Sequence, residues 1–450
     1  MKAAAGPQGE TGRLVVVTVL GLTQILAWGS SYYLLAVLAP AVAGSTGWPL
    51  PWVVGGLSLG LVVAGLVSPR VGRTIDRHGG RPVLAASAVL LAGGLCGLAA
   101  APSLPAYLAA WIVLGLAMGA GLYDAAFATL GRLYGRGARQ AITTLTLFGG
   151  FASTVCWPVS AYLVSALGWR GACLAYAGLH LTLALPLYLV ALPATTGSKG
   201  RLTDPAPERG RVGGSGEAAG PPSRSLFVQL AATITLGSAV SALMSVHLLS
   251  LLQARGLPLA AAVALGALVG PSQVGARAVE MVIGRYHHPI WTLMAATLLV
   301  AAGLGQIWAG LPMIALGLMA YGAGIGIESI ARGTLPLALF GASGYATLIG
   351  RLAMPSLLAQ AASPVIGAFL LQRAGPDGTI AAVLGIAVLD VVLMITLLVR
   401  TRPLRRQPNV AERSLDRGHD GWGPACRADR ELAYPPSEVP PTEMARGTDV

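Results

Sequence analysis

Ionisable side chains interrupt the apolar stretches that make up most of this sequence. They are Asp124, Arg277, Glu280, Glu328, Arg351 and Asp390. A charge at the centre of a bilayer costs about 2.5–3.5 kcal/mol on insertion scales, so such residues usually face a polar cavity or an opposite charge. An arginine in a cavity offers a forked donor to a carboxylate. Arg277 is therefore our first candidate for contact with an anionic solute, and Arg351 is the second.

The same charges also allow a structural interpretation. Arg277 and Glu280 are spaced i, i+3 and could pair with each other on one helix face. Asp124, Glu280 and Glu328 lie near one end of their apolar stretches, where we expect ion pairs that close that end, with direct substrate or proton binding as the alternative. For Asp390, in the middle of the last stretch, we expect a structural or oligomeric role.

A stripe of polar and aromatic residues lies in the first apolar stretch. Gln24, Trp28 and Tyr32 are spaced i, i+4 and i+8, which places them on one face of a helix. Such a face either lines a cavity or packs against the neighbouring helix, and the sequence leaves both interpretations open. We include all three as candidates for substrate binding.

The segment at residues 72–82 reads GRTIDRHGGRP and combines glycines with charges. Its glycines, Gly72 and Gly79 among them, permit close approach and a tight turn. Asp76 stands beside Arg77 and close to Arg81, so ion pairing here could lock two helices together.

Helices that span a membrane must position these groups. The chain has 450 residues, of which 54% are hydrophobic and 11% charged, against about 25% charged in soluble proteins. The mean hydropathy is +0.69. Twelve apolar stretches are long enough to be spans. They lie at about 14–40, 52–69, 82–100, 104–131, 141–167, 171–192, 225–252, 259–283, 290–308, 311–331, 346–371 and 379–400.

The distribution of basic residues predicts the orientation of these spans. With the N-terminus in the cytoplasm, sixteen Lys and Arg fall in inner segments and only Arg170, Arg255 and Arg373 in outer loops. The positive-inside rule then places both termini in the cytoplasm. It also accounts for the net charge of +12 without nucleic-acid binding.

The chain divides into two similar halves. A Gly-, Pro- and Ser-rich segment at 193–224 separates six spans from six. Gly119-Ala120-Gly121 recurs as Gly322-Ala323-Gly324, and an acid follows each copy. We therefore predict an all-α membrane protein of two pseudo-symmetric six-helix bundles. The predicted parts are a cytoplasmic N-terminus at 1–13, bundles at 14–192 and 225–400, the cytoplasmic linker at 193–224, and a disordered cytoplasmic tail at 401–450.

The segment at 72–82 resembles the loop motif of the major facilitator superfamily, G-x-x-x-D-R-x-G-R-[RK]. The resemblance extends over about residues 14–400, because the number of spans and the central linker also agree. It implies secondary transport by alternating access, without a cofactor but with possible coupling to a proton or ion gradient. It also implies a gate on the cytoplasmic side, formed by Gly72, Asp76, Arg77, Gly79, Arg81, Asp124, Glu280 and Glu328.

Departures from common patterns of that family bear on the substrate. Many proton-coupled members have an arginine where this chain has Trp111, and the glycine pattern of drug antiporters is missing from the fifth span. Residues 28–33 are loosely similar to the monocarboxylate and oxalate/formate branch. We favour an organic anion, such as a monocarboxylate, as the solute. Drug or metabolite efflux by proton antiport is the alternative, and a transporter-like solute sensor is a third hypothesis.

Other classes of protein find little support. The sequence has no HExxH or Walker motif, and its four cysteines form no metal-binding pattern, so we expect neither an enzyme nor a metal site. We expect a monomer in the plasma membrane, specifically a bacterial inner membrane. Its partners would be a small-molecule substrate and the lipid bilayer, with no nucleic acid.

Overall fold

A computed structural model describes residues 10–193, 224–310 and 314–405. Most of the predicted linker at 193–224 and of the tail at 401–450 lies outside these residues. All contacts discussed below lie before Leu398, within the first of the two units into which the chain divides. The described residues form helices and no strand.

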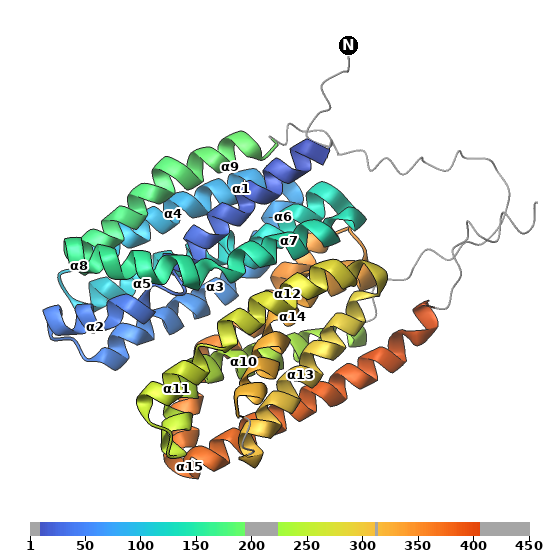
Figure 1. Cartoon of the computed structure of the whole chain (residues 1–450). Coiled ribbons are helices and arrows are strands. Elements are labelled where there is room, and N and C mark those ends of the chain that lie inside the picture. The colour runs from blue at the N-terminus through green and yellow to red at the C-terminus, as the bar shows by residue number, and fades with distance from the viewer. Residues whose placement is uncertain (1–9, 194–223, 311–313, 406–450) are drawn as a thin grey trace, which may run out of the picture. The chain divides into compact units, whose positions relative to one another are not determined.

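Fifteen α-helices follow one another along the described chain (Figure 1). They are α1 (Glu10–Gly29), α2 (Leu35–Thr46), α3 (Leu50–His78), α4 (Gly80–Ala100), α5 (Leu104–Gly121), α6 (Tyr123–Tyr134), α7 (Ala138–Gly150), α8 (Ala152–Leu179), α9 (Leu185–Ala191), α10 (Arg224–Ala254), α11 (Leu259–Gly266), α12 (Val269–Ile283), α13 (Pro289–Ala309), α14 (Ile314–Phe340) and α15 (Tyr345–Arg405). A π-helical segment, His180–Ala184, joins α8 to α9.

Ten helical segments of the described chain are long and apolar enough to cross a membrane. Two of them, Ala138–Ala191 and Tyr345–Thr401, have 54 and 57 residues. At about 1.5 Å per residue each would exceed twice the ~30 Å hydrocarbon core. Each is interrupted by a glycine with positive φ, Gly168 (φ 69°) and Gly375 (φ 69°). Splitting both segments there gives twelve crossings, and the predicted all-α membrane fold is confirmed.

The two halves repeat the same packing. In Figure 1 the helices from α1 to α9 gather in one group and those from α10 to α15 in another. A Cβ on Gly119 would lie 3.0 Å from the Ala64 carbonyl oxygen of α3. A Cβ on Gly322, its repeat partner, would lie 2.7 Å from the Val269 carbonyl oxygen of α12. Equivalent glycines thus let equivalent helix pairs approach closely. The exact bounds of the two bundles stay a prediction.

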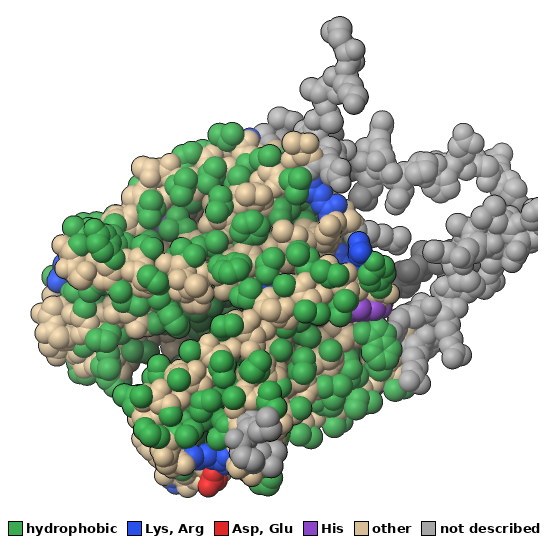
Figure 2. Space-filling model, in the orientation of Figure 1, with side chains coloured by type: hydrophobic (Ala, Val, Ile, Leu, Met, Phe, Trp, Pro, Cys, Tyr) green, Lys and Arg blue, Asp and Glu red, His purple; other side chains and the backbone are tan. Residues whose placement is uncertain are grey.

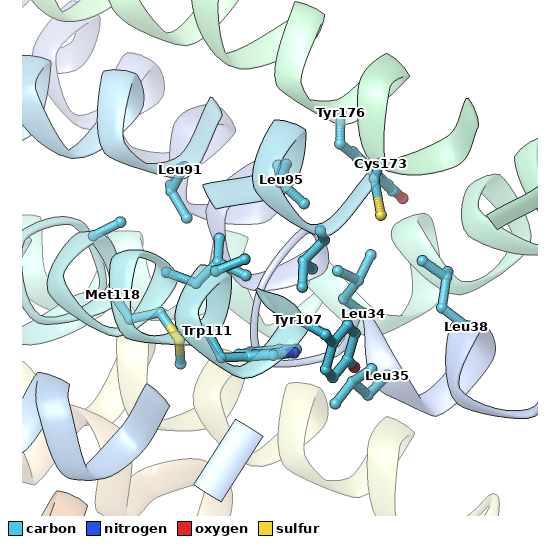
Figure 3. Close-up of a cluster of buried hydrophobic side chains, with 14 of the residues drawn as sticks. Leu34, Leu35, Leu38, Leu91, Leu95, Tyr107, Trp111, Met118, Cys173 and Tyr176 are labelled. Carbon is cyan, nitrogen blue, oxygen red and sulfur yellow. The ribbon is translucent and has the colours of Figure 1, made fainter. Parts of the chain in front are cut away.

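Trp111 lies at the centre of the first-half core (Figure 3). Its side chain is fully buried against Gly56 and Gly60 of α3. Tyr107, one turn earlier, donates its hydroxyl to the Val53 carbonyl at 3.1 Å. An apolar side chain thus holds α3 and α5 together at this position.

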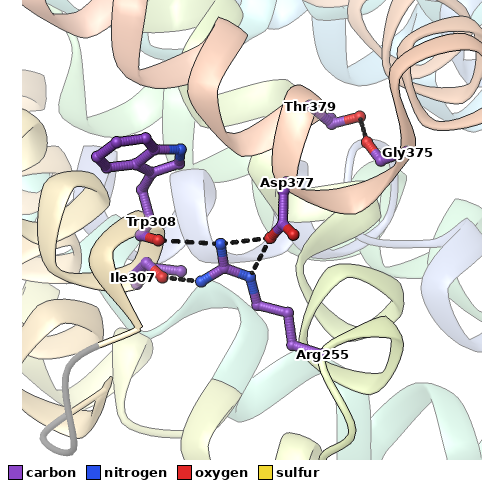
Figure 4. Close-up of polar contacts among 6 residues, drawn as sticks. All are labelled: Arg255, Ile307, Trp308, Gly375, Asp377 and Thr379. Carbon is purple, nitrogen blue, oxygen red and sulfur yellow. Dashed lines mark hydrogen bonds and ion pairs between the residues drawn. The ribbon is translucent and has the colours of Figure 1, made fainter.

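An arginine joins the helices at one end of the second half. Arg255, which follows α10, donates to the Asp377 carboxylate of α15 and to the backbone carbonyls of Ile307 and Trp308 (Figure 4). The ion pair measures 2.6 Å between Nη2 and Oδ1. All four residues belong to the second half, so this contact does not join the halves.

The first span is not one continuous helix, in contrast to the single stretch predicted at 14–40. Residues 30–34 form a turn between α1 and α2. The hydroxyls of Ser30 and Ser31 donate to the Leu26 and Ala27 carbonyls, at 2.7 and 2.6 Å. Serines that bond back in this way often bend helices.

The fourth span is also divided. Leu122 is extended (φ −83°, ψ −168°) and separates α5 from α6. Each break frees backbone groups from the helix, and both breaks lie beside the aromatic residues described next.

Candidate functional site

Arg277 of α12 reaches between the two halves of the fold. Its Nη1 donates to the Thr146 carbonyl of α7 at 3.2 Å, and its Nε donates to the Gly326 carbonyl of α14 at 3.0 Å. Gly150 leaves room for the guanidinium, because a Cβ there would overlap Nη1. The side chain is only 6% exposed. The backbone of both halves therefore fixes the position of this cation.

No carboxylate neutralises Arg277. The ion pairs among the described residues do not include it, and Nη2 has no hydrogen-bond acceptor among them. Glu280, one turn away, instead accepts from the Thr292 hydroxyl at 2.7 Å and lies 3.5 Å from His287 Nε2. A buried cation without a counter-charge is costly, so an anion bound at Nη2 would stabilise this arrangement.

Aromatic rings surround the approach to Arg277. We call Trp28, Tyr32, Tyr33, Tyr123 and Trp157 the aromatic cluster. The ring centroid of Trp28 lies 5.0–6.0 Å from the ring centroids of the three tyrosines in this cluster. The ring centroids of Tyr33 and Trp157 are 6.2 Å apart. Tyr33 and Tyr123 are within electrostatic range of Arg277. The cluster therefore combines with Arg277 to offer an apolar wall beside a positive charge.

Gln24 holds the aromatic cluster against the break in the fourth span. Its Nε2 donates to the Gly121 carbonyl at 2.6 Å, and its Oε1 accepts from Trp28 Nε1 at 3.2 Å. Gly121 is the last residue of α5, where helix carbonyls need partners from outside the helix. Gln24 is fully buried. Its side chain thus holds Trp28 in place, and its role in substrate binding stays a prediction.

An open pocket of about 480 Å³ adjoins the aromatic cluster. Val37 of α2 and Thr154 and Trp157 of α8 line it. Figure 2 shows a hollow between the helices of the first half and those of the second. From the second half, Ser245 of α10 lies beside the Tyr32 hydroxyl.

Asp124 forms a forked ion pair with Arg332 of α14. Arg332 Nη2 lies 2.9 Å from Oδ2, and Nε lies 3.2 Å from Oδ1. The two side chains are 17% and 19% exposed. Asp124 also lies in the first turn of α6, where a helix favours negative charge. The pair joins α6 of the first half to α14 of the second.

Two further contacts join the halves at the same end of the helices. Asp76 Oδ2 accepts from the backbone nitrogen of Thr347 at 2.8 Å and from its hydroxyl at 2.5 Å, at the start of α15. Arg139 Nη1 donates to the His287 carbonyl at 2.7 Å. We call the pairs Asp124–Arg332, Asp76–Thr347 and Arg139–His287 the inner latch.

The other predicted gate residues surround the latch or lie apart from it. Gly72 is buried, and a Cβ there would lie 3.2 Å from the Thr347 Cα. Gly79 has φ 84° and accommodates the turn from α3 to α4. Arg77 is exposed and Arg81 is half-buried, and neither forms an ion pair with Asp76.

Two other residues predicted from the sequence, Glu328 and Arg351, form no ion pair with any described residue. Glu328 is half-buried in α14, and its carboxylate lies against Gly237 of α10. Arg351 is exposed at the surface of α15 and makes no ion pair within the described chain.

Sequence reasoning did not identify Arg332, Thr347 or Thr146 as parts of the site. Arg332 lies four residues after Glu328 and so on the same helix face, which was a usable signal. Thr347 and Thr146 gave none, because they act in part through backbone groups that every residue carries.

The described residues contain no group of three or more His, Cys, Asp or Glu placed to hold a metal ion.

Comparison with known proteins identifies the family of the chain. The sequence profile of the Major Facilitator Superfamily matches residues 20–289. A comparison with curated proteins found no match.

Solved structures agree with the profile. The human organic anion transporter MFSD10 (TETRAN) is similar, with a TM-score of 0.66 and 20% identity over 85% of this chain and 99% of that one. The proton:xylose symporter XylE bound to 6-bromo-6-deoxy-D-glucose has a TM-score of 0.65 and 13% identity over 86% and 96%. The transporter FucP in the outward conformation has a TM-score of 0.62 and 11% identity over 86% and 99%.

Proposed function

Because the chain belongs to the Major Facilitator Superfamily, we propose that it is a secondary transporter of a small organic anion and that Arg277 binds the carboxylate of the solute. The fold alone does not choose the solute, since it is shared by an organic anion transporter and by a sugar symporter. The choice rests on one observation, the buried guanidinium of Arg277 that has no carboxylate partner.

The contacts of Arg277 suit this role. Two of its five N–H groups are used by the carbonyls of Thr146 and Gly326, which hold the side chain in place. The Nη2 group remains for a ligand. A carboxylate bound there would receive charge-assisted hydrogen bonds, worth about 1.5–3 kcal/mol each.

The aromatic cluster suits the apolar part of the same solute. Rings prefer edge-to-face or offset contacts, as the existing pairs of the cluster do. A carboxylate on a small apolar or aromatic body would place its charge at Arg277 and its body against Trp28 and Tyr33.

Alternating access follows from the inner latch. Its three pairs close the end that the arginine distribution assigns to the cytoplasm, and the hollow in Figure 2 lies between the same two halves. Opening the latch would expose the Arg277 site to the other side. We extend this proposal to a bacterial inner membrane with both termini inside, and reporter fusions at residue 210 and at the C-terminus test that orientation.

A matched ligand screen tests the solute class. The melting temperature of the purified protein is measured with benzoate, lactate or oxalate added. The neutral amides of these acids serve as controls of similar shape. We expect the acids to raise the melting temperature and the amides to leave it unchanged. Stabilisation by sugars or by cationic drugs, with no response to the acids, would end the organic-anion proposal and favour drug or metabolite efflux.

A further inference from the structure

A second ionisable site lies inside the second half, away from Arg277. Asp390 of α15 is 5% exposed, and its Oδ1 makes no hydrogen bond to any described residue. It lies fifteen residues beyond Gly375, or about 22 Å along the helix at ~1.5 Å per residue. The carboxyl group is therefore deep in the membrane, and its unpaired oxygen needs an explanation.

Two groups on neighbouring helices face Asp390. The hydroxyl of Thr233 on α10 is fully buried and lies beside the carboxyl, on which it acts as a hydrogen-bonding group. It has no partner at ordinary hydrogen-bond geometry among the described residues. Glu328 on α14 is within electrostatic range of Asp390.

One face of α10 brings these groups together. A Cβ on Gly237 would lie 2.8 Å from Cδ of Glu328, so only a glycine leaves room for that carboxylate. Gly237 follows Thr233 by four residues and thus lies on the same face of α10. The carboxylates of Glu328 and Asp390 therefore approach one helix face within a turn of each other.

Neither acid forms an ion pair with any described residue. Arg332 is the cation that acts on Glu328, but its guanidinium is held by both carboxylate oxygens of Asp124. Tyr321 is the other titratable group facing Glu328. Two like charges at this depth, neither of them in an ion pair, disfavour the doubly ionised state.

We propose that Glu328 and Asp390 together form a proton-binding site that couples transport to a proton gradient. One carboxylate takes H⁺ from water and becomes a neutral acid, so the charge of the pair changes from −2 to −1. When the proton is on Asp390, its O–H has the Thr233 hydroxyl as an acceptor. This inference rests on the proposed transport function, for which it names the coupling ion.

The charge on Glu328 also acts on the inner latch, through Arg332. Glu328 is half-buried and lies one turn from Arg332 on α14. When Glu328 is ionised it competes with Asp124 for the Arg332 guanidinium and weakens the Asp124–Arg332 pair. When the proton is on Glu328, that competition ends and the latch holds.

Infrared spectroscopy of the full chain in nanodiscs tests the proton site directly. At neutral pH exposed carboxyls are ionised, so we expect one carboxylic-acid C=O band that shifts in D2O. The band should disappear in Asp390→Asn and in Glu328→Gln. Asp377→Asn, in the exposed ion pair with Arg255, is the matched control and should retain it (Figure 4).

Each result decides the proposal. No D2O-sensitive acid band in the wild type overturns it, whether or not the variants fold. A band that persists in both Asp390→Asn and Glu328→Gln overturns it as well. Benzoate binding is measured on the same samples: benzoate binding without the acid band rejects the proton site and leaves the organic-anion proposal intact, whereas the band without benzoate binding does the reverse.

Discussion

Replacing Arg332 by glutamine should open the inner latch. The substitution removes both hydrogen bonds to Asp124, of 2.9 and 3.2 Å, and leaves a carboxylate that is 17% exposed without its cation. Breaking a buried pair costs about 3–5 kcal/mol, and an exposed pair contributes up to ~1 kcal/mol. For this partly buried fork we expect about 2–3 kcal/mol, or a roughly 30- to 150-fold shift toward the open latch.

Distance measurements between spin labels at the latch end provide the assay. Gln140 on α7 and Tyr286 after α12 are exposed and lie on opposite halves, so cysteines there accept labels. Cys96 and Cys426 are replaced by serine in this background. We expect a longer distance population to grow strongly in Arg332→Gln.

A matched control separates the latch from general loss of stability. Arg255→Gln breaks the Arg255–Asp377 pair, which lies within the second half (Figure 4). It should leave the Gln140–Tyr286 distances as in the wild type. Unchanged distances in Arg332→Gln, or an equal change in Arg255→Gln, would refute the reasoning.

Three further substitutions test the surrounding contacts. Asp76→Ala removes an acceptor at the start of a helix, so thermal melting should show a loss of about 1–2 kcal/mol, and Asp76→Asn, which keeps one acceptor, should lose less in stability while still lowering transport in vesicles. Gln24→Ala leaves the Gly121 carbonyl unpaired and should lower stability by about 1–3 kcal/mol in denaturation, a loss that a wild-type curve would contradict. Gly150→Ala should displace the Arg277 guanidinium and weaken benzoate binding in calorimetry with the charge retained; undiminished affinity would speak against the site.

The sequence alone predicted the helices and the buried charges Arg277, Glu280 and Asp390, whereas Arg351, predicted with them, is exposed. Apolar stretches of about twenty residues have few alternatives in a bilayer, and the spacing of Gly119 and Gly322 revealed the repeat. The residues closest to the proposed site, Arg277 and Trp28, were candidates because of their residue types, although the sequence left pairing of Arg277 with Glu280 and helix packing of the Trp28 stripe equally open.

Partners across the two halves could not be predicted in the same way. Asp124 and Arg332 are 208 positions apart, and Asp76 and Thr347 are 271 apart. Helical periodicity fixes neighbours within a helix but not the register between helices. For this reason local spacing suggested Arg277 with Glu280, whereas the structure gives Arg277 backbone carbonyls from both halves.

The breaks at residues 30–34 and at Leu122 were missed for a related reason. Hydropathy averages over a window and does not register a short change of backbone conformation. Gly29, Ser30 and Ser31 were a local signal, since glycine and serine pairs are common at kinks. Leu122 carries no such signal, and its extended backbone depends on tertiary contacts such as that of Gln24.

Calorimetric titration of benzoate into the wild type and into Arg277→Lys is the most direct test of the central claim. Lysine keeps the charge but loses the planar fork and its two backbone contacts. Losing charge-assisted hydrogen bonds worth about 1.5–3 kcal/mol predicts a roughly 10- to 150-fold weaker affinity. Arg351→Lys, on the exposed reserve candidate, should bind as the wild type does. Equal affinity in Arg277→Lys and the wild type, with both proteins folded, would contradict the assignment of Arg277 as the anion-binding residue.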